Sequence, residues 1–137
     1  MSAVFEYRLQ VQPEEIDHLG HVNNLVYLRW LIDAAVKHSA QQGWPAEKHQ
    51  QLGAGWIVRS HFIEYLHPAY EGESILVKTW VAEMKRVTSL RRFEVLRETD
   101  LKPLAKAETN WAFVEFSSGS PKRIPVEVSS AFEILQL

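Results

Sequence analysis

The sequence predicts an α+β fold in which one antiparallel sheet of about five strands packs on one long helix. Leu28, Ile32 and Ala35 recur at helical spacing in the longest periodic stretch. After Gly55 the apolar pattern changes to a period of two, which is typical of strands with two different faces. A helix segregated to one face of an antiparallel sheet is an α+β design, and such a sheet can curl around a central helix.

The first part of the chain is expected to hold one strand and the long helix. The strand covers residues 4–11 and the helix covers residues 24–41, with a loop over residues 14–22 between them. Asn23 or Asn24 is expected to cap the helix start, because an Asn side chain accepts a hydrogen bond from an unpaired N–H of the first turn. A glycine and a proline shortly after residue 41 are typical of a helix end.

In the rest of the chain, the apolar pattern has a period of two, so four more strands are expected there. These strands are predicted at residues 56–66, 74–83, 87–97 and 104–116. Two short helical segments are expected at residues 46–52 and 126–135. We find no linker or repeat, so residues 1–137 are expected to form a single domain.

The composition excludes several function classes. The net charge of −2 provides no basic stripe for nucleic acid or a membrane surface. The absence of cysteine excludes disulfides, thiol nucleophiles and cysteine-based metal sites, and it fits a cytoplasmic location. Motifs of serine hydrolases, dinucleotide-binding proteins and P-loop proteins are also missing. A zinc site is a remote alternative, for which the candidate ligands are His18, His21, His61 and His67.

The segment 17–24 carries the main chemical signal, and it reads Asp-His-Leu-Gly-His-Val-Asn-Asn just before the predicted helix. Asp17 either stabilises a turn, as Asp often does, or acts as a general base or nucleophile on an acyl carbon. Gly20 is expected to supply a tight bend. His21 either hydrogen-bonds across the loop and fixes its shape or assists proton transfer.

The predicted helix start offers a second functional element. A backbone N–H in the first helical turn has no partner within the helix, so that of Asn24 is a candidate oxyanion-hole donor. Plain capping by Asn23 and Asn24 is compatible with this role. Tyr27, one turn further on, either packs against the sheet or borders an acyl pocket.

Charged residues elsewhere have two readings each. Glu64 is either an outward-facing strand residue or a group that positions water, and Asp33 is either a surface charge or a buried partner. Arg59, Arg91 and the pair Lys122-Arg123 are surface charges or ligands of phosphate groups on a substrate. The candidate substrate-binding residues are therefore Gly20, Asn23, Tyr27, Glu64, Arg59, Arg91, Lys122 and Arg123.

The pattern D-x-x-G-H-V-N-N-x-x-Y, which begins at Asp17 and ends at Tyr27, resembles the signature of hotdog-fold acyl-CoA thioesterases of the 4-hydroxybenzoyl-CoA thioesterase type. Weaker similarities follow at Tyr65-x-x-Pro68 and at Arg123-Ile124-Pro125. The resemblance implies an antiparallel sheet wrapped around a long helix. It also implies hydrolysis of an acyl-CoA, with coenzyme A as part of the substrate and no metal or redox cofactor.

The resemblance further implies assembly and site roles. Two sheets would join edge to edge in a homodimer, often paired into tetramers, with the active site at the subunit interface. The acid at Asp17 would be the base or nucleophile, supported by His21, and the amide of Asn24 or a neighbour would polarise the thioester carbonyl. Because the 4-hydroxybenzoyl enzyme has apolar and aromatic residues where this chain has residues 21–24, a fatty acyl substrate is favoured over an aromatic one.

Three points stay open in the sequence. Acyl-ACP thioesterases of the same fold have similar patterns, so the acyl carrier is not determined. Trp30, Trp56 and Trp80 are candidates for setting the acyl chain length. Asp17 and His21 are also compatible with a hotdog enoyl-CoA hydratase or dehydratase, and a non-catalytic acyl-CoA-binding protein is a further alternative.

Overall fold

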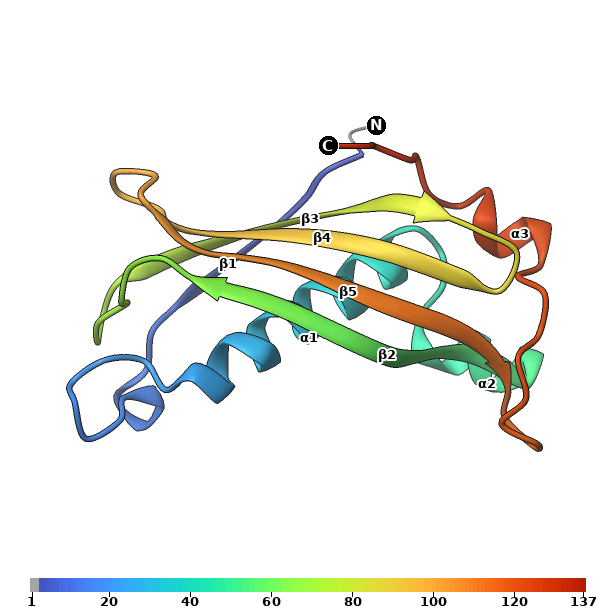
Figure 1. The fold of residues 1–137 in the computed structure, drawn as a ribbon, viewed down its shortest axis with the longest axis horizontal. Coiled ribbons are helices and arrows are strands. Elements are labelled where there is room, and N and C mark those ends of the chain that lie inside the picture. The colour runs from blue at the N-terminus through green and yellow to red at the C-terminus, as the bar shows by residue number, and fades with distance from the viewer. Residues whose placement is uncertain (1–2) are drawn as a thin grey trace.

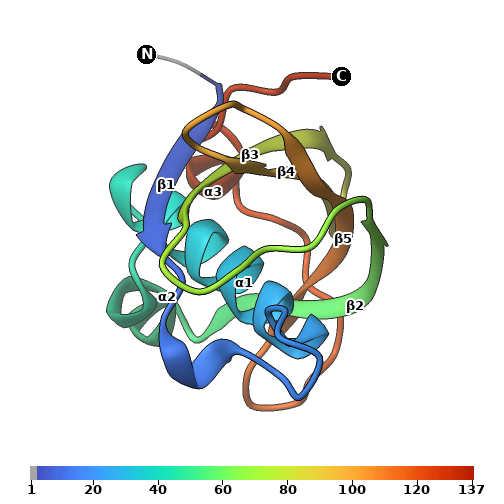
Figure 2. The ribbon, with the colours of Figure 1, turned by 90° about the vertical axis from the view of Figure 1, so that its left-hand side faces the viewer.

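The computed structural model describes residues 3–137, in which a five-stranded antiparallel sheet curls around helix α1 (Figures 1 and 2). The strand order in the sheet is β1-β3-β4-β5-β2. The strands are β1 (Phe5–Gln10), β2 (Ala54–Tyr65), β3 (Ser74–Met84), β4 (Thr88–Arg97) and β5 (Pro103–Glu115). The helices are α1 (Asn24–Gln41), α2 (Ala46–Leu52) and α3 (Val126–Ser129), with a 3₁₀ turn at Pro13–Glu15. These bounds confirm the predicted α+β class and element order.

The last helix is shorter than the predicted segment 126–135. After Ser129 the chain extends along β3 instead, where Ile134 forms a parallel bridge with Val81. The N–H of Leu135 also donates to the Val81 carbonyl oxygen. Strand β1 reaches only as far as Thr79 on β3, so the free edge beyond that residue is available to the C-terminal segment.

The main core lies between α1 and the inner face of the sheet. Trp30, Leu31 and Ala34 are buried on α1, where they belong to one cluster with Phe93 and Val95 of β4. Ala34 has a small side chain that allows α1 to lie close to the sheet. A second cluster at the other end of the molecule contains Trp44, Ala54, Phe113, Ile124 and Val128.

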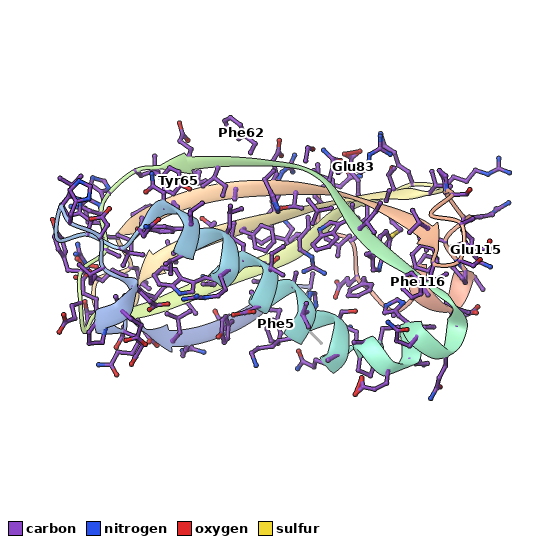
Figure 3. The ribbon with its side chains drawn as sticks, turned by 90° about the horizontal axis from the view of Figure 1, so that it is seen from below. Phe5, Phe62, Tyr65, Glu83, Glu115 and Phe116 are labelled. Atoms are coloured by element: carbon purple, nitrogen blue, oxygen red, sulfur yellow. The ribbon has the colours of Figure 1, made fainter. Side chains whose placement is uncertain are left out.

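Strand β2 forms a long, exposed edge of the sheet. It pairs with β5 on one side, and its other side has no neighbouring strand in the described chain. Ile57, Phe62 and Tyr65 are 44%, 65% and 43% exposed on this strand. Figure 3 shows Tyr65 near one end of the molecule and Phe116 near the other, with β2 running between these ends. In residues 3–137, no helix is long and apolar enough to cross a membrane.

Candidate active site

The loop before α1 is a tight turn closed by its own backbone. The N–H of Asp17 donates to the His21 carbonyl oxygen at 2.8 Å, and the N–H of Gly20 donates to the Asp17 carbonyl oxygen at 3.0 Å. Gly20 has a φ of 84°, which is favourable for glycine and strained for other residues. An antiparallel bridge between Ile16 and Val22 closes the base of the turn. The sequence expectation of a tight bend at Gly20 agrees with this geometry.

The Asp17 side chain contributes to the same turn through one of its two oxygens. Its Oδ1 accepts hydrogen bonds from the N–H groups of Leu19 at 2.9 Å and His21 at 3.4 Å. Its Oδ2 receives no hydrogen bond from residues 3–137, and the residue is only half-buried. The turn-stabilising role and a chemical role are therefore compatible, because they use different oxygens of one carboxylate.

The start of α1 is capped by Asn23 rather than Asn24. The Asn23 side chain accepts from the N–H of Leu25 at 2.9 Å, and its carbonyl oxygen accepts from the N–H of Val26 at 2.9 Å. The N–H of Asn24 makes no hydrogen bond with the described part of the chain, and Asn24 is exposed. The first helical turn therefore retains one free donor at the positive end of the helix dipole.

The helix start is tied to the end of β2. The hydroxyl of Tyr65 donates to the carbonyl oxygen of Asn24 at 3.1 Å, and the Tyr65 ring meets the Tyr27 ring edge-on at 5.2 Å. Tyr27 is buried in the main core, and burial raises its pKa to about 12. Tyr27 thus packs inside the molecule, while Tyr65, which was not among the predicted site residues, contacts the helix start directly.

A buried acid behind the loop was also missed by the sequence reasoning. Glu15 accepts from the Arg29 guanidinium at 2.7 Å and from the Trp30 indole N–H at 3.2 Å. It also accepts from the N–H of Gln12 at 2.8 Å, completing a capping box on the 3₁₀ turn. A proline followed two residues later by Glu is the local signal that could have found this cap. The ties to Arg29 and Trp30 hold the loop against α1.

His21 is half-buried, and its ring meets the Tyr70 ring edge-on at 5.4 Å. Its imidazole nitrogens make no hydrogen bond with residues 3–137, whereas its backbone bonds across the loop to Asp17. The loop contact that we expected of the His21 side chain is therefore made by the His21 backbone.

The remaining candidate residues lie away from this loop. Glu64 is exposed on β2, opposite Lys106 in the register with β5. Arg59 lies at the irregularity in the β2–β5 pairing, between Val58 and Ser60. Lys122 and Arg123 follow β5, at the end of the sheet where β2 begins. Asp17 and the pair Lys122-Arg123 are thus at opposite ends of the molecule, while Arg59 lies midway along β2.

A cavity of about 240 Å³ lies at that opposite end, between the second half of α1, α2 and the sheet. Its walls include Trp44, Trp56, Trp111 and Phe116, and they also include the buried Arg91. Arg91 is therefore an interior residue rather than a surface charge. Among residues 3–137, no three His, Asp or Glu side chains are close enough together to hold a metal ion.

A family model described as the thioesterase-like superfamily matches residues 11–132. The chain belongs to this superfamily. It is therefore a thioester hydrolase. The acyl-CoA thioesterase YbgC of Haemophilus influenzae is 27% identical over 135 residues, which cover 96% of both chains.

Solved structures of this superfamily's hotdog fold are also similar to the chain. A hypothetical protein from Aquifex aeolicus aligns with a TM-score of 0.87 and 27% identity, over 94% of this chain and 99% of that one. A 1,4-dihydroxy-2-naphthoyl-CoA thioesterase from Synechocystis aligns with a TM-score of 0.86 over 93% of this chain and 94% of that one. At an identity of 18%, this match shows only that the two proteins share a fold.

Proposed function

We propose that this thioester hydrolase cleaves a fatty acyl-CoA to the free acid and coenzyme A, at a site formed by Asp17 and the start of α1. The observation that carries the proposal is the free N–H of Asn24 beside a loop whose carboxylate has one oxygen unengaged. The similarity to the Haemophilus acyl-CoA thioesterase supports acyl-CoA as the substrate class.

The chemistry follows from these two groups. The N–H of Asn24 stabilises the oxyanion that forms when the thioester carbonyl is attacked, and one such donor contributes roughly 3 kcal/mol. Asp17 either attacks the carbonyl carbon itself, expelling the thiolate of coenzyme A and leaving a mixed anhydride for water to cleave, or it deprotonates the attacking water. His21 supports the loop that holds Asp17.

We also propose that two copies pair through the exposed edges of β2. A long edge strand with exposed apolar side chains is an aggregation hazard unless another strand covers it. Antiparallel pairing about the midpoint of β2, between Arg59 and Ser60, sets Tyr65 of one protomer beside the partner's Ala54. The active-site loop then lies next to the end of the partner that carries the basic pair Lys122-Arg123, which provides cations for the phosphates of coenzyme A.

Thiol release from a panel of acyl-CoAs, short to long and aromatic, tests the proposed reaction. Asp17→Asn keeps an oxygen for the N–H of Leu19 but removes the charge, so the loop stays folded while turnover falls by about 100-fold or more. Asp100→Asn, in the exposed β4–β5 hairpin, is the matched control and is expected to keep wild-type turnover. Near wild-type turnover in Asp17→Asn would exclude the proposed role.

A further inference from the structure

The cavity beneath the second half of α1 is not a purely apolar space. Two residues that line it, His49 and Trp111, each carry a buried polar atom, Nε2 and Nε1 respectively, that has no hydrogen-bond partner in the described residues. Since Nδ1 of His49 lies 3.1 Å from the Ala54 carbonyl oxygen, it carries the hydrogen, and Nε2 is an acceptor. Buried polar atoms in native proteins nearly always have partners. The residues around the cavity therefore carry polar groups that the described chain leaves unsatisfied.

Arg91 supplies the charge of this cavity. It is 5% exposed, and its Nη1 donates to Nδ1 of His38 at 2.9 Å and to Oγ1 of Thr79 at 3.1 Å. Both partners are neutral acceptors: Thr79 carries no charge, and burial together with the proximity of Arg91 lowers the pKa of His38 to about 4. Across residues 3–137, no carboxylate forms an ion pair with Arg91, although eight other ion pairs are present.

The bonding pattern leaves one edge of the guanidinium unused. Nη1 has two hydrogens, and His38 and Thr79 accept both. Nε and Nη2 make no hydrogen bond with the described chain, and together they form the edge that binds a carboxylate through two parallel bonds. A buried charge without a counter-ion is costly in free energy. Binding of an anion beside the Arg91 guanidinium would therefore be favourable.

We propose that this cavity receives the acyl part of the thioester and that Arg91 selects an acyl chain that ends in a carboxylate. The inference rests on the proposed function and deepens it, because it names the substrate class of the same site. The aromatic walls hold the methylene chain, while the free edge of Arg91 donates to a terminal anion. A cavity of about 150 Å³ is known to bind benzene, so 240 Å³ accommodates a compact chain.

The proposed dimer brings this cavity to the reacting carbonyl. Within one chain the cavity borders Ala35 and Ser39, whereas the active-site loop precedes Asn24. Ala35 lies eleven positions after Asn24 in the helix, or about 16 Å along the axis. Antiparallel pairing of β2 sets the loop of one protomer beside the partner's Gly55 and the partner's Trp56, which border the partner's cavity. The acyl chain would thus be bound by one protomer and cleaved by the other.

Matched pairs of acyl-CoAs test the selection. Hexanoyl-CoA is compared with adipoyl-CoA, and octanoyl-CoA with suberoyl-CoA, because each pair differs in a terminal carboxylate alone. The wild-type protein is expected to show kcat/KM at least about tenfold higher for one of the carboxylated members, as a charge-assisted pair warrants. Arg91→Met is expected to abolish this preference by lowering kcat/KM for the carboxylated members, and Arg91→Lys is expected to retain part of it.

Arg92→Met is the matched control. Arg92 is the next residue on β4, where it pairs with Glu108 on the outer face, so its loss should leave the preference unchanged. Circular dichroism and melting curves of each variant establish that it is folded. Equal kcat/KM within both substrate pairs for the wild-type protein, or an unchanged preference in folded Arg91→Met, would overturn the inference.

A binding measurement separates this inference from the proposed reaction. Three tryptophans border the cavity, so titration with hexanoate or with hexanol is followed by tryptophan fluorescence. Tighter binding of hexanoate than of hexanol, lost in Arg91→Met, supports an anion site at Arg91 even if no acyl-CoA is hydrolysed. If acyl-CoAs are hydrolysed but hexanoate and hexanol bind equally, water is the natural occupant of the cavity. The proposed selection of a terminal carboxylate by Arg91 is then wrong.

Discussion

The hydroxyl of Tyr65 donates a hydrogen bond to the carbonyl oxygen of Asn24, so the last residue of β2 holds the first residue of α1. The peptide N–H of the same Asn24 is the free donor that we assign to the oxyanion. Strand β2 is also the edge through which we propose that two copies pair. Tyr65 thus connects the proposed interface with the proposed active site.

Tyr65→Phe is expected to reduce kcat more than it raises KM. The ring and its contact with Tyr27 remain, while the bond that anchors the carbonyl of Asn24, the residue whose N–H is the proposed donor, is lost. Because a neutral hydrogen bond contributes about 1 kcal/mol, a fall of roughly fivefold is expected in steady-state thiol release. Tyr70→Phe provides a control with the same chemical change. An unchanged kcat in Tyr65→Phe would contradict the orienting role.

Glu15→Gln is expected to destabilise the folded state by about 1–3 kcal/mol, measured by urea unfolding. The carboxylate is buried and accepts a charge-assisted hydrogen bond from Arg29, and the amide replaces one acceptor oxygen with a donor. Glu14→Gln changes the exposed neighbour in the same turn and is expected to have little effect. Equal unfolding free energies for the two variants would show that the buried contacts contribute nothing.

The stability of the protein is expected to fall as the pH is lowered from about 6.5 towards 4, in part because of His38. Burial and the charge of Arg91 lower the pKa of His38 from 6.5 to about 4 in the folded state. The unfolded chain therefore binds a proton at higher pH than the folded chain, so stability is present above 6.5 and is lost as the pH falls through this window.

His38→Gln isolates that contribution, since the amide oxygen can still accept from Arg91 but does not titrate. As the pH falls over this range, the unfolding free energy of the wild-type protein should decrease more than that of His38→Gln. The difference should be of the order of 3 kcal/mol. Urea unfolding at a series of pH values measures the difference. Parallel pH profiles for the two proteins would mean that His38 is not responsible.

Val58→Glu is expected to produce a monomer with little activity. Val58 is 38% exposed on β2, near the midpoint about which we propose that two copies pair, so the substitution places a charged side chain from each protomer in the proposed interface, where burying a charge is costly. Sedimentation and thiol release would be measured on the same preparation. Leu101→Glu, at an exposed position of the β4–β5 hairpin, is the control. Full activity in a monomeric Val58→Glu would rule out a site shared between protomers.

Local signals in the sequence predicted the elements but not every boundary. The α1 bounds agree with the predicted 24–41, because an Asn cap and a glycine stop act within a few residues of the helix ends. The predicted helix over residues 126–135 was too long, because pairing of Ile134 with β3 outweighs local helical preference. The sequence also offered two possible caps, and the geometry selects Asn23.

By itself the sequence determined the fold class, the order of its elements and the loop that carries Asp17, because apolar periodicity and turn residues act over short distances. Only the tertiary structure decided which charges are buried. Arg91 lies in a cavity and Glu15 lies against α1, although each is next to a more exposed charged residue, Arg92 and Glu14 respectively. Burial depends on which elements pack together over long separations in the chain, and no local pattern around these two residues encodes that packing.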